Sequence, residues 1–150
     1  MTQEHKKLLL KDLCGRLPYG VKCYITEAND TSILAAVLED GENTLFNFWE
    51  DDRKIVYGAQ LYISEFKPYL FPLSSMTEEQ KKDFIKVAGY EIREEDCGRH
   101  TETYYYDIVG HENTLYPNCD AIGWLNAHHF DYNGLIEKGL ANDATGLNIY

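Results

Sequence analysis

Short β-like segments recur between Val21 and Phe66, and turn residues separate them. They are rich in β-branched and aromatic side chains, and they lie at 21–26, 32–38, 44–49, 55–57 and 61–66. Between the second and third segments, Asp40-Gly41 is a typical dipeptide of a tight hairpin. This spacing predicts a curled antiparallel sheet of about five short strands.

An amphipathic helix is expected before this sheet. Leucines recur at three- and four-residue spacing from Leu9 to Leu17 and form an apolar stripe. Pro18 and Gly20 follow directly, and both residue types end helices. The stripe therefore predicts an N-terminal helix with one face packed on the sheet.

Two prolines within 67–73 predict an extended crossover after the sheet, because proline cannot donate to the hydrogen-bond ladder. Ser75 and Glu78 match a capping box at the start of a helix that Gly89 ends. The buried face of that helix is expected to comprise Phe84, Ile85, Val87 and Ala88. Beyond it, the pattern predicts a loop or short strand at 90–100, a strand at 103–109, helices at 121–130 and 133–141, and a loose tail at 142–150.

These elements predict one α+β domain over residues 1–150. A length of 150 residues fits a single domain with a core of its own. Residues 1–73 would form the helix and a small β-barrel-like part. Residues 74–150 would form a mixed, largely helical part with an additional strand.

The chain is acidic overall, with a formal net charge of −11, but the charge is uneven. Residues 1–24 carry five bases and two acids, whereas residues 25–52 carry eight acids and no base. The net charge argues against a basic polyanion-binding protein of the histone or ribosomal kind. No stretch approaches the ~20 apolar residues of a membrane span, and Leu8-Leu9-Leu10 is too short for a signal-peptide core. We therefore expect a cytoplasmic protein without a membrane partner.

Cofactor motifs are missing from the sequence. The four cysteines, at positions 14, 23, 97 and 119, form no C-x-x-C pair, and free, mostly buried thiols are expected in a reducing compartment. The sequence has no glycine-rich phosphate loop and no nucleophile elbow. These observations predict no cofactor and favour a protein that is not an enzyme.

His128, His129 and Asp131 form the most enzyme-like cluster, because imidazole and carboxylate groups are ligands of Zn²⁺ and other divalent ions. A further ligand would come from His111, Glu112, Cys119 or Asp120. Adjacent histidines on a helix project about 100° apart, so they cannot both face one ion without a break in the helix. In the alternative that we favour, one histidine packs beside Trp124 and Asp131 caps the next helix.

Two other groups of residues predict binding surfaces. The basic side chains at the N-terminus would contact phosphates of a nucleic acid, and they are Lys6, Lys7, Lys11, Arg16 and Lys22. Tyr104, Tyr105 and Tyr106 are candidates for a protein interface, because tyrosine offers a large contact area at a small entropy cost. Half-buried packing within a sheet is the alternative for these tyrosines.

Three phrases of the sequence resemble a family of uncharacterised proteins from Bacteroides-type gut bacteria and their phages and prophages. The phrases are LPYGVK at 17–22, KPYLFPLSSMTEE at 67–79, and WLNAHHFDY at 124–132 followed by GLIEKGLA at 134–141. The resemblance implies a phage or prophage setting and no particular activity. A helix followed by about five bent strands also resembles Sm-like and SH3-like small barrels, some of which form rings or bind RNA.

The sequence thus favours a non-catalytic assembly or interaction protein, associated with a phage or prophage, that binds a protein partner or a second copy of itself. One alternative is a nucleic-acid-binding protein that uses the basic N-terminal helix. The other is a small metal-dependent enzyme that uses His128, His129 and Asp131.

Overall fold

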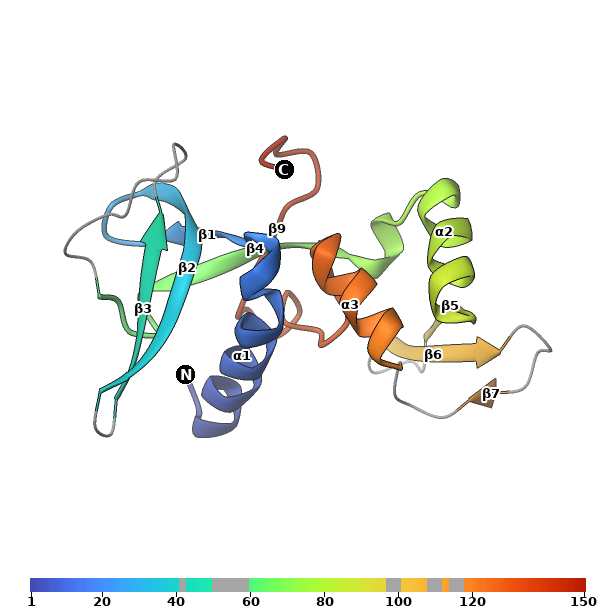
Figure 1. Ribbon diagram of the computed structural model, residues 1–150, viewed down its shortest axis with the longest axis horizontal. Coiled ribbons are helices and arrows are strands. Elements are labelled where there is room, and N and C mark those ends of the chain that lie inside the picture. The colour runs from blue at the N-terminus through green and yellow to red at the C-terminus, as the bar shows by residue number, and fades with distance from the viewer. Residues whose placement is uncertain (41–42, 50–59, 97–100, 108–111, 114–117) are drawn as a thin grey trace.

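The computed structural model describes residues 1–40, 43–49, 60–96, 101–107, 112–113 and 118–150. For 39–40, 43, 90–96, 101–107 and 112–113 it describes the backbone alone. The fold is α+β, as the sequence predicts. A sheet covered by the helix α1 (Gln3–Arg16) lies at one end of the molecule, and the helices α2 (Glu78–Ala88) and α3 (Cys119–Ala127) lie at the other (Figure 1).

The main sheet is mixed and does not close into a barrel. Its strands follow the order β3-β2-β1-β4-β8, and β9 also pairs with β4. The antiparallel part consists of β1 (Lys22–Ile25), β2 (Asp30–Asp40), β3 (Asn43–Trp49) and the first half of β4 (Phe66–Pro72). The second half of β4 pairs in parallel with β8 (Phe130–Asp131) and β9 (Asn142–Asp143). The prediction of an Sm-like or SH3-like barrel is therefore wrong, because β4 separates from β1 and pairs with strands from the end of the chain.

The prolines of β4 lie within the sheet, contrary to the predicted crossover. Thr26 N–H donates to the Glu65 carbonyl at 3.0 Å, so Thr26 and Glu65 form a hydrogen-bonded pair. In an antiparallel ladder, every second pair counted from there is hydrogen-bonded. Cys23 faces Pro68 at a position without ladder hydrogen bonds, and the proline nitrogen points away from β1. β9 begins to pair only at Tyr69, so none of the described strands requires the missing donor of Pro68.

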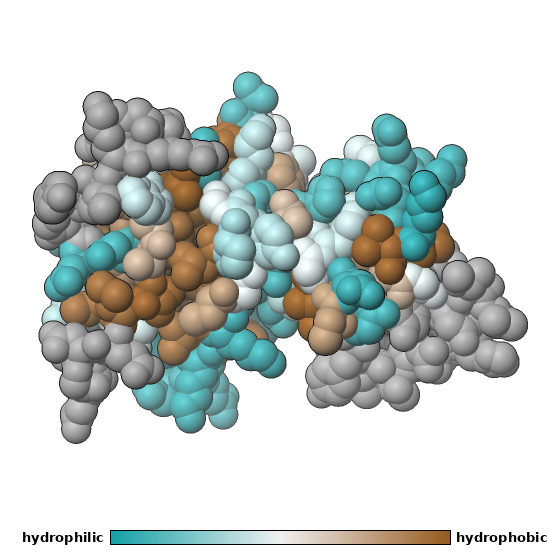
Figure 2. All heavy atoms as spheres, viewed as in Figure 1, coloured by the Kyte–Doolittle hydropathy of each residue, from teal (hydrophilic) through white to brown (hydrophobic). Residues whose placement is uncertain are grey.

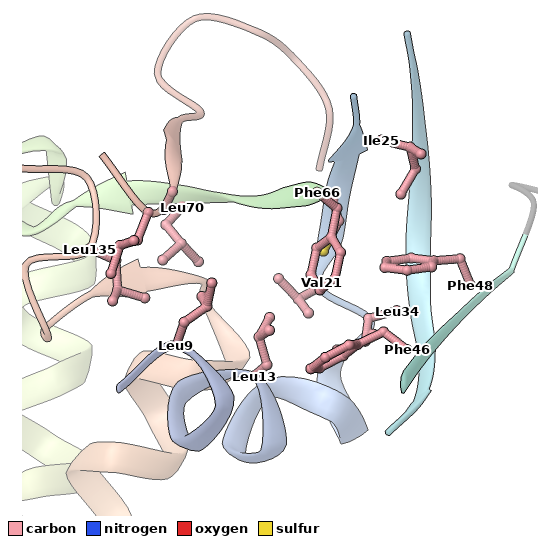
Figure 3. Packing of buried hydrophobic residues seen from close by; sticks show 13 residues of the cluster. Leu9, Leu13, Val21, Ile25, Leu34, Phe46, Phe48, Phe66, Leu70 and Leu135 are labelled. Atoms are coloured by element: carbon pink, nitrogen blue, oxygen red, sulfur yellow. The ribbon is translucent and has the colours of Figure 1, made fainter. Parts of the chain in front are cut away.

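The helix α1 ends where its sequence predicts, before Pro18 and Gly20. The Thr2 side chain caps its start, and a 3-10 turn η1 (Leu17–Tyr19) follows its end, where Gly20 adopts a φ of 67°. Leu9 and Leu13 are fully buried against the sheet (Figure 3). This helix and the sheet share one core, whose buried members are Leu9, Leu13, Val21, Cys23, Ile25, Leu34, Phe46, Phe48, Phe66, Leu70, Leu135, Leu140 and Ala141.

A second core lies between α2 and α3. The capping box of α2 is formed by Thr77 and Gln80 rather than by Ser75 and Glu78, because a short turn η2 (Leu73–Ser75) precedes it. Gly89 ends α2 as predicted, with a φ of 74°. Val87, which the sequence predicts on the buried face of α2, is 47% exposed. The buried residues of this second core are Leu73, Met76, Phe84, Ala88, Ala121, Trp124, Leu125 and Phe130.

Three further strands extend from this second core. β5 (Tyr90–Asp96), β6 (Thr101–Asp107) and β7 (Glu112–Asn113) form a separate antiparallel sheet. Residues 133–141 form turns rather than the predicted helix. Of the described cysteines, Cys23 is buried while Cys14 and Cys119 are exposed, so the expectation of mostly buried thiols is wrong for two of these three.

The segment 142–150 is docked on β4 rather than loose. Tyr150 lies where β1 and β4 separate: its hydroxyl accepts from Lys22 N–H at 3.0 Å and donates to the Tyr69 carbonyl at 2.8 Å. Lys22 and Tyr69 would be the next hydrogen-bonded pair of this ladder. The Tyr150 hydroxyl therefore continues the ladder by one step, and burial raises its pKa, so it remains protonated and able to donate.

We expect Tyr150→Phe to lower the free energy of unfolding by about 1–2 kcal/mol, because the Lys22 N–H and the Tyr69 carbonyl lose their shared partner. Urea unfolding followed by circular dichroism measures this change. Tyr19→Phe is the matched control, since Tyr19 is as exposed as Tyr150, at 42%, and lies outside the ladder. Equal stability of the two variants would contradict the role of the hydroxyl.

Candidate functional site

The structure does not bring His128, His129 and Asp131 together as metal ligands. His128 is exposed at the end of α3, where its ring stacks on Trp124 at 3.8 Å. His129 is buried and its ring stacks on Tyr150 at 3.9 Å. Both carboxylate oxygens of Asp131 accept backbone N–H groups, from Leu135 at 2.9 Å and Ile136 at 2.8 Å. No group of three metal-ligating side chains forms within the described residues.

Asp131 and His128 therefore take the structural roles that the sequence offered as the alternative. Asp131 caps a turn rather than a helix, and His128 packs beside Trp124 with its Nδ1 at 2.9 Å from the Trp124 carbonyl oxygen. The helical backbone ends between the two histidines. His129 has a φ of 58°, which turns its ring away from that of His128.

Asp12 and Arg16 form a buried ion pair that contacts the residue after His129. Arg16 donates to both carboxylate oxygens of Asp12, through Nε at 2.6 Å and Nη2 at 3.0 Å, and both side chains are fully buried. Nη2 also donates to the Phe130 carbonyl at 2.8 Å. The Asn133 amide donates to Asp12 at 2.8 Å. The pair thus joins α1 to β8 and to the turn after it.

We expect Asp12→Ala to lower the free energy of unfolding by about 3–5 kcal/mol, because Arg16 would remain buried without its counter-charge. The double variant Asp12→Leu/Arg16→Met should lose less, since it removes both charges. Urea unfolding measures both effects. Glu78→Ala, which breaks the exposed pair between Glu78 and Lys81, is the control and should change stability little. A loss from Asp12→Ala no larger than the control would show that the buried pair is dispensable.

The charge of Arg16 and the burial of His129 act together on the imidazole. Burial first, and then the Arg16 guanidinium, lower the pKa of His129 from 6.5 to about 4. His129 is therefore neutral in the folded protein at neutral pH. Its Nδ1 and the Arg16 Nη1 are both buried and have no hydrogen-bond partner among the residues that the structure describes.

Protonation of His129 should therefore destabilise the fold. As the pH falls, the unfolded chain binds this proton near pH 6.5, but the folded chain binds it only near 4. Between these values stability declines, by up to about 3 kcal/mol from this group. Urea unfolding at the two ends of this range should show a smaller decline in His129→Asn, because asparagine tolerates the positive φ but does not titrate. The same decline in both proteins would assign the effect to other groups.

The basic side chains of the N-terminal segment are separated by the fold. Lys6, Lys7 and Lys11 are exposed on α1. Arg16 is fully buried and paired with Asp12, so it cannot contact a phosphate as the sequence suggested. Lys22 is half-buried at the start of β1, where its N–H binds the Tyr150 hydroxyl.

Tyr104, Tyr105 and Tyr106 lie on β6, the middle strand of the smaller sheet. Their backbones pair with Arg93, Ile92 and Glu91 of β5. Their side chains lie outside the described part of the chain. The predicted tyrosine interface therefore stays a prediction.

An apolar groove lies between η1 and the strands β2 and β3. Its volume is about 430 Å³, and its lining consists of Leu17, Pro18, Tyr19, Gly20, Ile33, Leu34, Ala35 and Trp49. Ile33 pairs with Trp49 across the hairpin, and the register of β2 shifts between Leu34 and Ala36. The face seen in Figure 2 shows hydrophobic residues gathered over this part of the sheet. We call this hollow the Tyr19–Trp49 groove.

The Tyr19–Trp49 groove is not evident from the sequence alone. Ile33 and Ala35 belong to a nearly continuous apolar run, for which strand burial on both faces is the ordinary interpretation. The structure instead leaves both half-buried and Tyr19 42% exposed. The Pro-Tyr-Gly turn directly after α1 was the available signal, because it places an aromatic ring beside the sheet.

Comparison of the chain with protein-family models, with curated proteins and with solved structures finds no match. Within the described ranges, no helix combines the length and the apolar composition that crossing a bilayer requires.

Proposed function

We propose that this is a non-catalytic interaction protein that binds an extended segment of a protein partner in the Tyr19–Trp49 groove. The observation that carries the proposal is the groove itself, with a volume of about 430 Å³ and with proline, tyrosine and tryptophan among its lining residues. Aromatic-lined grooves of this kind accept apolar, proline-containing segments, which are already extended and lose little entropy on binding. Tyrosine and tryptophan also dominate the binding energy of many protein interfaces.

The charge around the groove indicates which partner it would accept. Ile33, Leu34, Ala35 and Trp49 come from the segment 25–52, which carries eight acids and no base. Glu27 and Asp30, just before the groove residues of β2, are both exposed. A partner segment with basic residues beside its apolar anchors would complement this charge and bind faster than an acidic segment.

The contacts of His128, His129 and Asp131 favour this proposal over a metal-dependent enzyme. Asp131 uses both oxygens in backbone hydrogen bonds, and the two histidine rings stack on different aromatic residues. The phage or prophage setting implied by the sequence resemblance remains a prediction.

Fluorescence titration tests the proposal, because the chain has two tryptophans and Trp124→Phe leaves Trp49 as the reporter in the groove. The probe is a synthetic octapeptide of leucine and proline with arginine at both ends, compared with the same peptide flanked by glutamate. We expect the arginine peptide to shift the Trp49 emission and to bind about tenfold more tightly, a difference of about 1.4 kcal/mol.

Tyr19→Ala, made in the Trp124→Phe background, should abolish the response to the arginine peptide. Tyr62→Ala is the matched control, because Tyr62 is 51% exposed and lies outside the groove. Equal binding of the two peptides, or equal loss in both variants, would contradict the proposal. A different result is that neither peptide binds and that sedimentation velocity shows a dimer, which Tyr19→Ala abolishes. The groove would then bind a second copy of the chain rather than a partner protein.

A further inference from the structure

A second hollow lies between α1 and the segment 61–64, apart from the Tyr19–Trp49 groove. Its volume is about 380 Å³, and its lining consists of Gln3, Lys6, Lys7, Leu10, Thr44, Tyr62, Ile63 and Ser64. This volume lies within the range of small-molecule sites. We call it the Lys6–Tyr62 hollow.

Local structure holds the two walls of the hollow in place. Residues 3, 6, 7 and 10 recur at helical spacing, so they share one face of α1. On the other side, Leu61 exchanges two backbone hydrogen bonds with Phe46 of β3, both at 3.0 Å. The Glu65 carboxylate then accepts Tyr62 N–H at 2.6 Å, and Glu65 N–H donates to the Tyr62 carbonyl at 2.9 Å. The backbone of Tyr62 is therefore held on the wall opposite the lysines.

The lining combines three kinds of surface. Leu10 and Ile63 pack against the main core and form an apolar base. Tyr62 leaves 51% of its surface exposed, which gives a flat aromatic face at the edge of the hollow. Lys6 and Lys7 are both exposed on the opposite wall. An aromatic face beside two cations suits a ligand with a flat ring and a negative charge.

We propose that the Lys6–Tyr62 hollow binds a nucleotide, either free or as part of a single strand, with its base against Tyr62 and its phosphate at Lys6 and Lys7. Bases stack on aromatic side chains while lysines contact phosphates in single-strand binding sites. Thr44, Ser64 and Gln3 add polar groups that can bond to the sugar or the base edge.

The acidic net charge does not oppose a site at this position. Residues 1–24 carry five bases and two acids, and one of those acids, Asp12, is neutralised by Arg16 in the interior. Glu65 faces the Tyr62 backbone rather than standing alone at the lysines. At physiological salt, charges further than about 8 Å away are largely screened, so distant acids act weakly on exposed phosphates here.

Binding of fluorescein-labelled octathymidylate, followed by fluorescence polarisation, and of adenosine monophosphate, followed by calorimetry, tests this site on the intact protein. Two phosphate contacts on a single strand predict about a sevenfold loss of oligonucleotide affinity between about 50 mM and about 200 mM salt. Binding of both ligands would assign the site to the nucleotide unit itself. Binding of the oligonucleotide alone would assign it to a single strand.

Lys6→Gln/Lys7→Gln should remove most of this salt dependence, whereas Tyr62→Ala should weaken binding about tenfold and leave the salt dependence unchanged. The matched controls are Lys82→Gln/Lys86→Gln, which removes two exposed lysines of α2, and Tyr19→Ala. No binding of either ligand at about 1 mM in low salt would overturn the proposal. Equal losses in the Lys6/Lys7 and Lys82/Lys86 variants would also overturn it, because non-specific charge would then explain the binding.

Discussion

The buried ion pair of Asp12 and Arg16 connects parts of this fold that are 114 and 121 residues apart in the sequence. Its hydrogen bonds reach Phe130 in β8 and Asn133 in the following turn, so one helical turn of α1 contacts the C-terminal third of the chain. Two charges removed from water are stable only while each has its partner. Burial, and then the same guanidinium, lower the pKa of His129, so the neutral state of that histidine is part of the same arrangement.

The strand β4 is the second connection between the two cores. It pairs with β1 through Pro68 and then with β8 and β9 from Tyr69 onward, so a single strand belongs to both halves of the molecule (Figure 1). Pro68 is tolerated there because its missing donor faces a side on which no described strand pairs with it. Where β4 separates from β1, the Tyr150 hydroxyl forms a hydrogen bond with the backbone of each strand. An edge that would otherwise expose unpaired backbone groups is thereby covered.

The two proposed sites have opposite electrostatic character, and the fold explains their separation. The Tyr19–Trp49 groove lies on the strands of the acidic segment, while the Lys6–Tyr62 hollow uses the first two turns of the basic helix. Both sites rest on exposed tyrosines beside apolar residues. Tyrosine can supply contact area in either setting, because its ring packs while its hydroxyl stays hydrated. The surrounding charge then decides which ligand each tyrosine favours.

Local patterns in the sequence determined the α+β class, the end of α1, the β2–β3 hairpin and the end of α2 at Gly89, because leucine spacing, turn dipeptides and glycine act over a few residues. They also indicated a capping role for Asp131, although the segment that it caps forms a turn rather than the predicted helix. They could not place Pro68 in a strand, Arg16 in the interior or Tyr62 opposite Lys6. Each of those outcomes depends on a partner distant in sequence, such as Cys23 for Pro68 and Phe130 for Arg16. The tertiary structure supplies these partners, since packing and not local propensity decides which side chains meet.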